Sequence, residues 1–116
     1  MRNNIFKICP FDIWEEAKLV GLFIGYGIDI TDGFIHFSTI HQIENTLKHH
    51  FKNSSNLVLL SIKPDNLNLK WENSRNNEIF PHLYDTFNTN IVEDIFILKK
   101  DNFGNFIIPK KISSEL

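Results

Sequence analysis

The stretch Leu57-Val58-Leu59-Leu60-Ser61-Ile62 constrains the fold more than any other part of the chain. It is aliphatic except for one serine, and no charge or proline interrupts it. A strand directs alternate side chains to opposite faces, so both faces of this segment need apolar cover. We therefore expect a central strand. The chain has 116 residues, 42% of them hydrophobic, which is enough to bury a core within one domain over residues 1–116.

Two helices are expected before this strand. Asp12 and Glu15 have the spacing of a capping box, and apolar residues then recur at helical intervals up to Gly21, the expected stop. A second helix is expected over residues 39–51, begun by a hydroxyl cap. The intervening residues 22–33 contain three glycines and are expected to be a loop, either over a ligand or simply on the surface.

The remaining pattern predicts several short strands. Alternation and β-branched or aromatic residues place them at residues 5–9, 34–37, 67–72, 79–84, 91–98 and 106–108. The last two are expected to form a hairpin, and Pro81 predicts an edge or irregular strand. Residues 109–116 are expected to be a frayed tail. This order predicts an α+β fold with two N-terminal helices and a mixed, mostly antiparallel sheet.

Charge and cysteine content exclude several classes of partner. The net charge is −2 and the sequence pI is about 6.2, which argues against a nucleic-acid or membrane surface. No segment approaches the roughly 20 apolar residues of a membrane span, and no signal peptide is visible. Cys9 is the single cysteine and lies in an apolar strand, so we expect a buried, inert thiol. The absence of disulfides is consistent with a cytoplasmic protein.

A histidine lies in an unusual position within residues 32–39. The expected strand there alternates, so Ile35 and Phe37 share one face, and His36 and Ser38 share the other. The first pair is expected to lie in the core. The second pair then needs hydrogen-bond partners or a ligand. We treat His36 and Ser38 as candidate site residues, with a purely structural histidine as the alternative.

Other polar side chains occur at strand ends beside aromatic residues. Lys7 falls among apolar residues of the first strand, which is an odd place for an ammonium unless that face opens onto a cavity. Glu72, Arg75, His82 and Tyr84 are the remaining candidates. Their structural alternatives are a salt bridge of Glu72 with Arg75 or Lys7, a turn-fixing His82 and a core Tyr84.

The standard catalytic signatures are absent. The chain has no phosphate-binding glycine loop, dinucleotide fingerprint, His-Glu-x-x-His or Gly-x-Ser-x-Gly. A metal site of His36, His82 and Glu72 is conceivable, but its spacing is not diagnostic, so no metal is assigned. The histidines of the second helix, at 41, 49 and 50, are expected to be solvated.

The chain also resembles a known family. The residues that carry the resemblance are 5–10, Trp14, Ala17, Gly21, 32–39, Gln42, 57–60, 69–72, Ser74-Arg75 and 80–84. The blocks Gly-Phe-Ile-His and Phe-Pro-His-Leu-Tyr are the most specific of these. Over about residues 5–84 the chain resembles the bacterial domain of unknown function 952 family. It departs where members often have a tyrosine in place of Phe6 and glycines near Asn76-Asn77.

This resemblance implies a fold similar to that of ADP-ribosyltransferases, in which a split, mostly antiparallel sheet holds NAD in a cleft. In such enzymes a carboxylate stabilises the oxocarbenium-like ribose that forms when nicotinamide leaves. By position, the resemblance implies Lys7 on the first strand, His36 and Ser38 on the second, Glu72 as the carboxylate, and His82 and Tyr84 on the wall. NAD is thus a possible cofactor, and the cofactor is otherwise unknown.

Three functions remain open. The first is ADP-ribosyl transfer or cleavage of the NAD glycosidic bond, with Glu72 as electrostatic stabiliser, Tyr84 stacking on a ring, and Lys7 or Arg75 holding phosphate. The second is another small-molecule enzyme, in which His36 or His82 is the general acid or base and Arg75 binds an anionic substrate. The third is a non-catalytic ligand-binding or interaction module. A small-molecule ligand is the expected partner, and NAD binding, turnover and ligand class distinguish the three functions.

Overall fold

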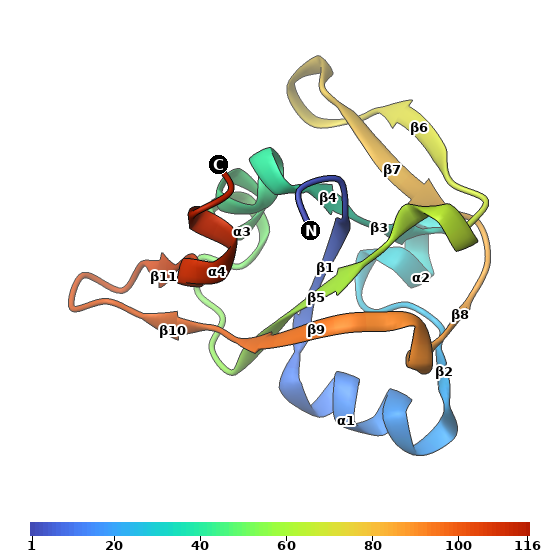
Figure 1. Ribbon diagram of the computed structural model, residues 1–116, viewed down its shortest axis with the longest axis horizontal. Helices are drawn as coiled ribbons and strands as arrows, with labels where there is room; N and C mark the ends of the chain where they lie inside the picture. The colour runs from blue at the N-terminus through green and yellow to red at the C-terminus, as the bar shows by residue number, and fades with distance from the viewer.

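Four antiparallel strands form the main sheet of the computed structural model, which describes residues 1–116 (Figure 1). Their order is β4 (Ser38–Thr39), β1 (Ile5–Pro10), β5 (Leu57–Ile62) and β9 (Val92–Ile97). All six residues of β5 are buried, which confirms the expected central strand. Every strand pair is antiparallel, so the α+β class is confirmed and the expectation of a mixed sheet is wrong.

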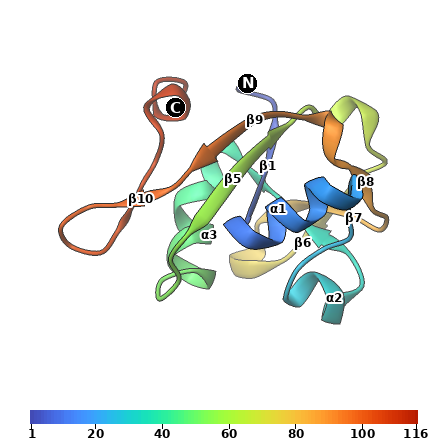
Figure 2. The same cartoon turned by 90° about the horizontal axis from the view of Figure 1, so that it is seen from below.

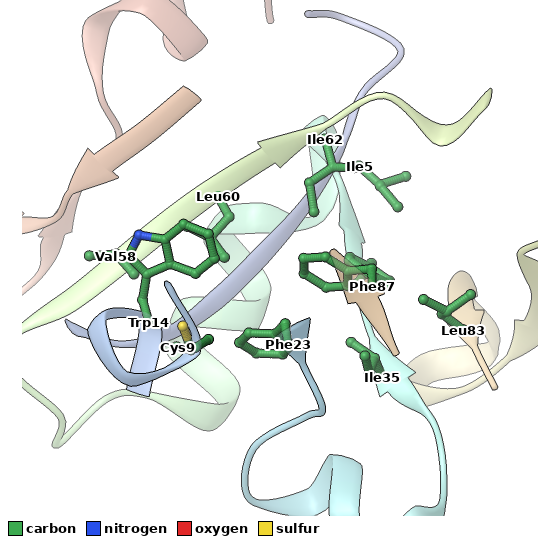
Figure 3. Close-up of a cluster of buried hydrophobic side chains, with 12 residues drawn as sticks. Ile5, Cys9, Trp14, Phe23, Ile35, Val58, Leu60, Ile62, Leu83 and Phe87 are labelled. Atoms are coloured by element: carbon green, nitrogen blue, oxygen red, sulfur yellow. The ribbon is translucent and has the colours of Figure 1, made fainter. Parts of the chain in front are cut away.

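Helices cover both faces of this sheet. In Figure 1, α1 (Phe11–Val20) lies below the diagonal strands, and α3 (Ile43–His50) lies above them. The alternation of β5 divides the core accordingly: Val58 and Leu60 pack with α1, and Leu57 and Leu59 pack with α3. Figure 3 shows the first cluster, with Trp14 of α1 lying over Val58 and Leu60. Burial of each such large side chain contributes roughly 1.5–3 kcal/mol.

The helix ends differ from the expected capping. α1 begins directly after Pro10, and Asp12 accepts a hydrogen bond from the adjacent Ile13 N–H, so the predicted Asp12–Glu15 capping box is wrong. Glu15 instead pairs with Lys18. The helix ends at Gly21, as expected, because φ is +88° there and glycine adopts that conformation without a Cβ clash.

The second helix is preceded by a tighter turn. A 3-10 turn, η1 (Ile40–Gln42), leads into α3, and the Thr39 N–H donates to Gln42 Oε1 at 3.0 Å. The predicted helix over residues 39–51 is therefore two helical segments. A buried side-chain face runs through both, as expected.

A second, three-stranded sheet has the order β3 (Ile35–His36), β7 (Ile79–Leu83) and β6 (Lys70–Asn73). The single strand predicted over residues 34–37 is divided, because the chain passes at Phe37 from β3 in this sheet to β4 in the main sheet. Both Ile35 and Phe37 are buried, as predicted.

Pro81 lies in a central strand, so the prediction of an edge strand is wrong. Its carbonyl accepts a hydrogen bond from Phe37 N, at the last rung between β3 and β7. The N–H and C=O of one strand residue point to the same neighbour, so the N–H that proline lacks would also face Phe37. The sheet therefore loses one terminal ladder bond and tolerates the proline.

The predicted half-buried strand over residues 67–72 is shorter and more exposed than expected. It begins at Lys70, and the Trp71 side chain is 51% exposed, although Leu67 and Leu69 pack against the core. A 3-10 turn, η2 (Pro64–Asn66), precedes this segment.

Residues 22–33 form more than a loop. Strand β2 (Leu22–Phe23) pairs with β8 (Phe87–Asn88), and a short helix, α2 (Ile28–Asp32), follows. Figure 2 shows α2 beside the end of the β6–β7 sheet. A 3-10 turn, η4 (Thr89–Ile91), then leads from β8 into β9.

The C-terminal region confirms one prediction and corrects another. Strands β10 (Lys99–Lys100) and β11 (Phe106–Ile107) form the predicted hairpin, although β9 ends before it. Residues 110–113, expected to fray, form α4 (Lys110–Ser113). This helix is held in place because Ile112 is fully buried in the part of the core that packs with α3.

Two further findings concern the whole chain. The Cys9 thiol is buried as predicted, and burial raises its pKa to about 12, which keeps it protonated and unreactive. None of the helices has the length and apolar character needed to traverse a bilayer.

Candidate functional site

A cavity of about 220 Å³ lies between the two sheets and the end of α3. Its wall includes parts of β1, α2, β3, β4, α3 and β7, together with the turn η3 (Arg75–Asn77) between β6 and β7. The predicted site residues fall into two groups. Those that line the cavity are Lys7, His36, Ser38, Arg75 and His82, whereas Glu72 and Tyr84 do not line it.

Asp29 is the centre of one end of the cavity. Its side chain is 1% exposed and accepts bonds from Lys7 Nζ at 2.7 Å and His36 Nδ1 at 2.6 Å. The backbone N–H groups of Tyr26 and His36 also donate to it, at 2.9 and 3.0 Å. Burial alone would raise the pKa of Asp29, but the bonds from His36 and Lys7 outweigh burial and lower the pKa. Asp29 is therefore a buried carboxylate.

The local sequence fixes this carboxylate in place. Gly27 precedes α2 with φ +58°, and Gly33 ends it with φ +81°. Gly25 lies so close to the helix that an added Cβ would be 2.9 Å from the Asp29 Cβ. Glycine at 25 is therefore needed for α2 to pack where Asp29 can reach Lys7.

Lys7 and His36 each contact two partners through their side chains. Lys7 Nζ also donates to the His36 carbonyl at 2.9 Å, which explains how an ammonium is accommodated among apolar residues. His36 Nε2 contacts Asp32 Oδ2 at 3.0 Å, so both ring nitrogens have carboxylate partners. His36 is thus a tightly held wall residue with no free nitrogen.

The second carboxylate–histidine pair consists of Glu72 on β6 and His82 on β7. Register pairs His82 with His36, and His82 Nδ1 contacts Glu72 Oε1 at 2.8 Å. The Tyr84 hydroxyl donates to the same oxygen at 2.8 Å. These bonds, first from His82 and then from Tyr84, lower the pKa of Glu72. The predicted alternatives of a Glu72 salt bridge with Arg75 or Lys7 and of a core Tyr84 are therefore wrong.

The remaining nitrogen of His82 has no partner. Nε2 is buried and makes no hydrogen bond, although the residue lines the cavity. Phe34 stacks on the His82 ring with centroids 4.2 Å apart, which holds the ring in place. Because Glu72 accepts the Nδ1 proton, the neutral ring carries its lone pair on Nε2. The site therefore contains an oriented and unsatisfied base.

The opposite end of the cavity is cationic. Arg75 Nη2 donates to Thr46 Oγ1 at 3.2 Å, and Thr46 contacts Ser38 Oγ at 2.8 Å. The guanidinium lies 4.9 Å from the centre of the Phe80 ring. Its side chain forms no ion pair, and burial lowers its pKa. Most donors of Arg75 are thus available.

A tight turn presents Arg75 to the cavity. Asn76 and Asn77 have φ of +57° and +60°, and the Glu78 N–H donates to the Arg75 carbonyl. Two successive positive φ values at the centre of the turn Arg75–Glu78 are typical of type I′, which asparagine tolerates better than most residues.

His50 is exposed, as predicted, and it also contributes to the wall. It is an exposed residue at the end of α3 whose side chain borders the cavity. Partial burial of the ring lowers its pKa, and Arg75, His49, His36 and Lys7 lower it further. His50 thus lies beside cationic groups.

Sequence reasoning missed several further wall residues, namely Tyr26, Asp29, Thr46, His50 and Ser54. One signal pointed to Asp29, since a buried Lys7 requires a carboxylate partner. No group of three or more histidine, cysteine or acidic side chains is arranged to hold a metal ion.

Comparisons with known proteins agree on one family. Residues 8–95 match the family described as Protein of unknown function (DUF952), whereas no curated protein gives a significant match. The crystal structure of protein CC0527 from Caulobacter crescentus is 35% identical, with a TM-score of 0.89 over 96% of this chain and 99% of that chain. A crystal structure of its double mutant is 34% identical, with the same coverage and TM-score.

The solution NMR structure of the same Caulobacter crescentus protein is also similar. It is 38% identical, with a TM-score of 0.79 over 88% of this chain and 90% of that chain. The family match covers most of the sequence, and the structural match extends over nearly all of it. This chain belongs to the DUF952 family of proteins of unknown function.

Proposed function

We propose that the cavity binds a small anionic molecule and that His82, oriented by Glu72, acts on it as a general acid–base. The observation that carries this proposal concerns His82, a residue of the cavity wall. Its buried Nε2 atom has no hydrogen-bond partner. Leaving a buried polar atom unsatisfied costs roughly 1–3 kcal/mol. A ligand that reaches Nε2 would recover that free energy on binding.

The Glu72–His82 arrangement supports acid–base chemistry. A carboxylate on Nδ1 fixes the tautomer and orientation of the imidazole and stabilises the imidazolium that forms when Nε2 takes a proton. The bond of 2.8 Å is within the range for such a pair. In this proposal His82 removes a proton from the bound molecule at Nε2 and later returns it. Glu72 and Tyr84 are positioning residues, because they act through His82.

The charge distribution supports an anionic ligand. Asp29 is the acidic residue on the cavity wall, and its oxygens are occupied by Lys7, His36 and two backbone N–H groups. Arg75 has no carboxylate partner, so its charge is available. An Arg guanidinium gives strong, directional hydrogen bonds to carboxylate or phosphate oxygens.

The narrower hypothesis of an ADP-ribosyltransferase-like fold and of chemistry on NAD has less support. Its carboxylate candidate, Glu72, does not line the cavity and is bonded to His82 and Tyr84. The cavity, at about 220 Å³, is small for a whole dinucleotide and suits a smaller molecule. NAD is therefore one probe among several.

The test uses a panel of small phosphorylated and carboxylic metabolites, with NAD included. Ligand-observed NMR detects binding, and product signals during prolonged incubation detect turnover. We expect a panel member that binds to be converted, and His82→Gln to lower its turnover by about 10²–10⁴-fold without loss of folding. His41→Gln, on an exposed side chain, is the matched control.

Two results would contradict the proposal. Failure of every anion in the panel to bind at millimolar concentration would contradict the proposal that the cavity binds a small anionic molecule. Unchanged turnover in His82→Gln would remove the acid–base role. Binding without turnover by any member would favour the alternative of a non-catalytic ligand-binding module.

A further inference from the structure

We propose that the end of the cavity between α3 and the η3 turn is a subsite for a phosphate group, and that His50 takes up a proton when the group binds. This inference rests on the proposed function, because it concerns the same cavity. It adds the class of ligand, a small phosphorylated molecule, and a dependence of its affinity on pH.

The donors of this subsite come from several directions. Arg75 and Ser74 belong to the β6–β7 connection, Thr46 and His50 belong to α3, and Ser54 follows that helix. A planar carboxylate is satisfied along one edge of a guanidinium. A phosphate group presents more acceptor oxygens in a tetrahedral arrangement, and hydroxyl and imidazole donors on separate elements match that arrangement better.

The existing contacts leave capacity for these bonds. Arg75 has one side-chain hydrogen bond, to Thr46 Oγ1, and its contact with the Phe80 ring uses no hydrogen-bond donor. The Ser74 and Ser54 hydroxyls have no hydrogen-bond partner in the protein. The subsite is thus a set of donors with one cationic side chain that forms no ion pair within the protein.

The charges around His50 explain why anion binding should be coupled to protonation of this histidine. Arg75 faces it from η3, His49 from its own helix, His36 from β3 and Lys7 from β1. Burial and these charges hold the pKa of His50 below its ordinary value, so the neutral ring is favoured in the free protein. A bound dianion offsets the positive charges and stabilises the imidazolium. Affinity for a dianion should therefore rise as the pH falls.

The experiment titrates the full chain with sulfate, inorganic phosphate and acetate, followed by protein-observed NMR. Sulfate keeps its charge across the range tested, so any change in its affinity between pH 8 and pH 5.5 reports protonation of the protein. We expect sulfate and phosphate to shift the signals of Arg75, Ser74, Thr46 and His50. Acetate should bind about tenfold more weakly or worse.

Variants identify the groups responsible. Arg75→Gln should weaken sulfate binding about tenfold or more, because it removes the positive charge that the subsite offers to an anion. His50→Gln should abolish the pH dependence of sulfate affinity. His49→Gln is the matched control, because His49 adjoins His50 but does not line the cavity, and it should retain most of that dependence.

The outcomes separate this inference from the proposed function. Acetate binding as tightly as sulfate, or unchanged sulfate binding in Arg75→Gln, would overturn the phosphate subsite. A pH dependence that persists in His50→Gln would overturn the proton coupling. Anions that bind only beside His36 and His82 would contradict the subsite and leave the proposed function standing, whereas no anion binding at all would contradict both.

Discussion

Two histidines lie opposite each other on paired strands of the second sheet, each held by a carboxylate, and the surroundings of the two carboxylate–histidine pairs differ sharply. Asp29 holds His36 with a carboxylate that is 1% exposed, and every polar group of that pair has a partner. Glu72 holds His82 with a carboxylate that is 38% exposed, and the buried Nε2 of His82 has no partner. His36 and His82 are direct neighbours in the register, but His36 lies on the edge strand β3 and His82 on the central strand β7, so their carboxylate partners come from different elements, α2 and β6.

The difference assigns separate roles to the two pairs. A fully satisfied buried network stabilises one arrangement of the chain, because removing any member leaves another unpaired. A buried polar atom without a partner destabilises the fold, and such costs are tolerated where they serve binding or catalysis. The Asp29 pair therefore stabilises the cavity wall, whereas the Glu72 pair carries the acid–base role that we propose.

The largest effect should come from Asp29→Asn. This change leaves the buried Lys7 ammonium without a countercharge, so the free energy of unfolding should fall by about 3–5 kcal/mol. Urea denaturation measures it. Asp32→Asn is the control, because Asp32 contacts the same histidine from an exposed position and should cost less than about 1 kcal/mol. Equal losses would show that the buried Asp29 carboxylate is no more important to stability than the exposed Asp32 carboxylate.

The same carboxylate should set the acid limit of stability. The pKa of Asp29 is lower in the folded state than in the unfolded chain, so its contribution is complete above the ordinary aspartate pKa of about 4. That contribution is lost as the pH falls through the lower, folded-state pKa. Urea denaturation from pH 6 to pH 3 should show this loss in the natural chain and a flatter profile in Asp29→Asn. Parallel profiles would contradict the assignment.

Replacing each histidine with phenylalanine should separate the pairs further. His36→Phe removes bonds to Asp29 and Asp32 and should lower the free energy of unfolding by about 2–4 kcal/mol. His82→Phe removes one bond to Glu72 but also removes the unpartnered Nε2, so the change should stay within about 1 kcal/mol. Thermal and urea denaturation test the ranking, and a larger loss for His82→Phe would reverse it.

The smallest effect should come from Tyr84→Phe. The Tyr84 hydroxyl donates to Glu72 and contributes to lowering the Glu72 pKa, after His82. Removal of the hydroxyl should raise the pKa of Glu72 part of the way towards the ordinary glutamate value. The rise should be incomplete because the hydrogen bond with His82 remains. Carbon-13 NMR titration of the Glu72 carboxyl measures this shift. An unchanged pKa would show that Tyr84 does not position the pair.

The sequence predicted most of the core and much of the cavity wall, for identifiable reasons. Alternation in residues 34–37 and the apolar run of β5 report burial directly, so Ile35, Phe37 and the central strand were recognised. The same alternation placed His36 and Ser38 opposite the core, and both line the cavity. The strand-end positions of Arg75 and His82 likewise indicated polar groups near a site.

Other features could not be read from local patterns. The five-residue α2 is too short for helical periodicity, and its glycines indicated a loop, so the role of Asp29 was missed. Glu72 was recognised, but its partner depended on the β6–β7 register, which brings His82 and Tyr84 to it. His50 lies on an exposed helix end, and only the placement of η3 beside α3 makes it part of the wall.

The most direct test of the proposed role of His82 is a measurement of the tautomer of its ring. Long-range proton–nitrogen NMR spectra, recorded at a pH where the ring is neutral, distinguish a protonated nitrogen from an unprotonated one. We predict a proton on Nδ1, a free lone pair on Nε2, and a change in the Nε2 signal when an anion from the panel binds. A proton on Nε2 in the natural chain, with no response to any bound anion, would contradict that role.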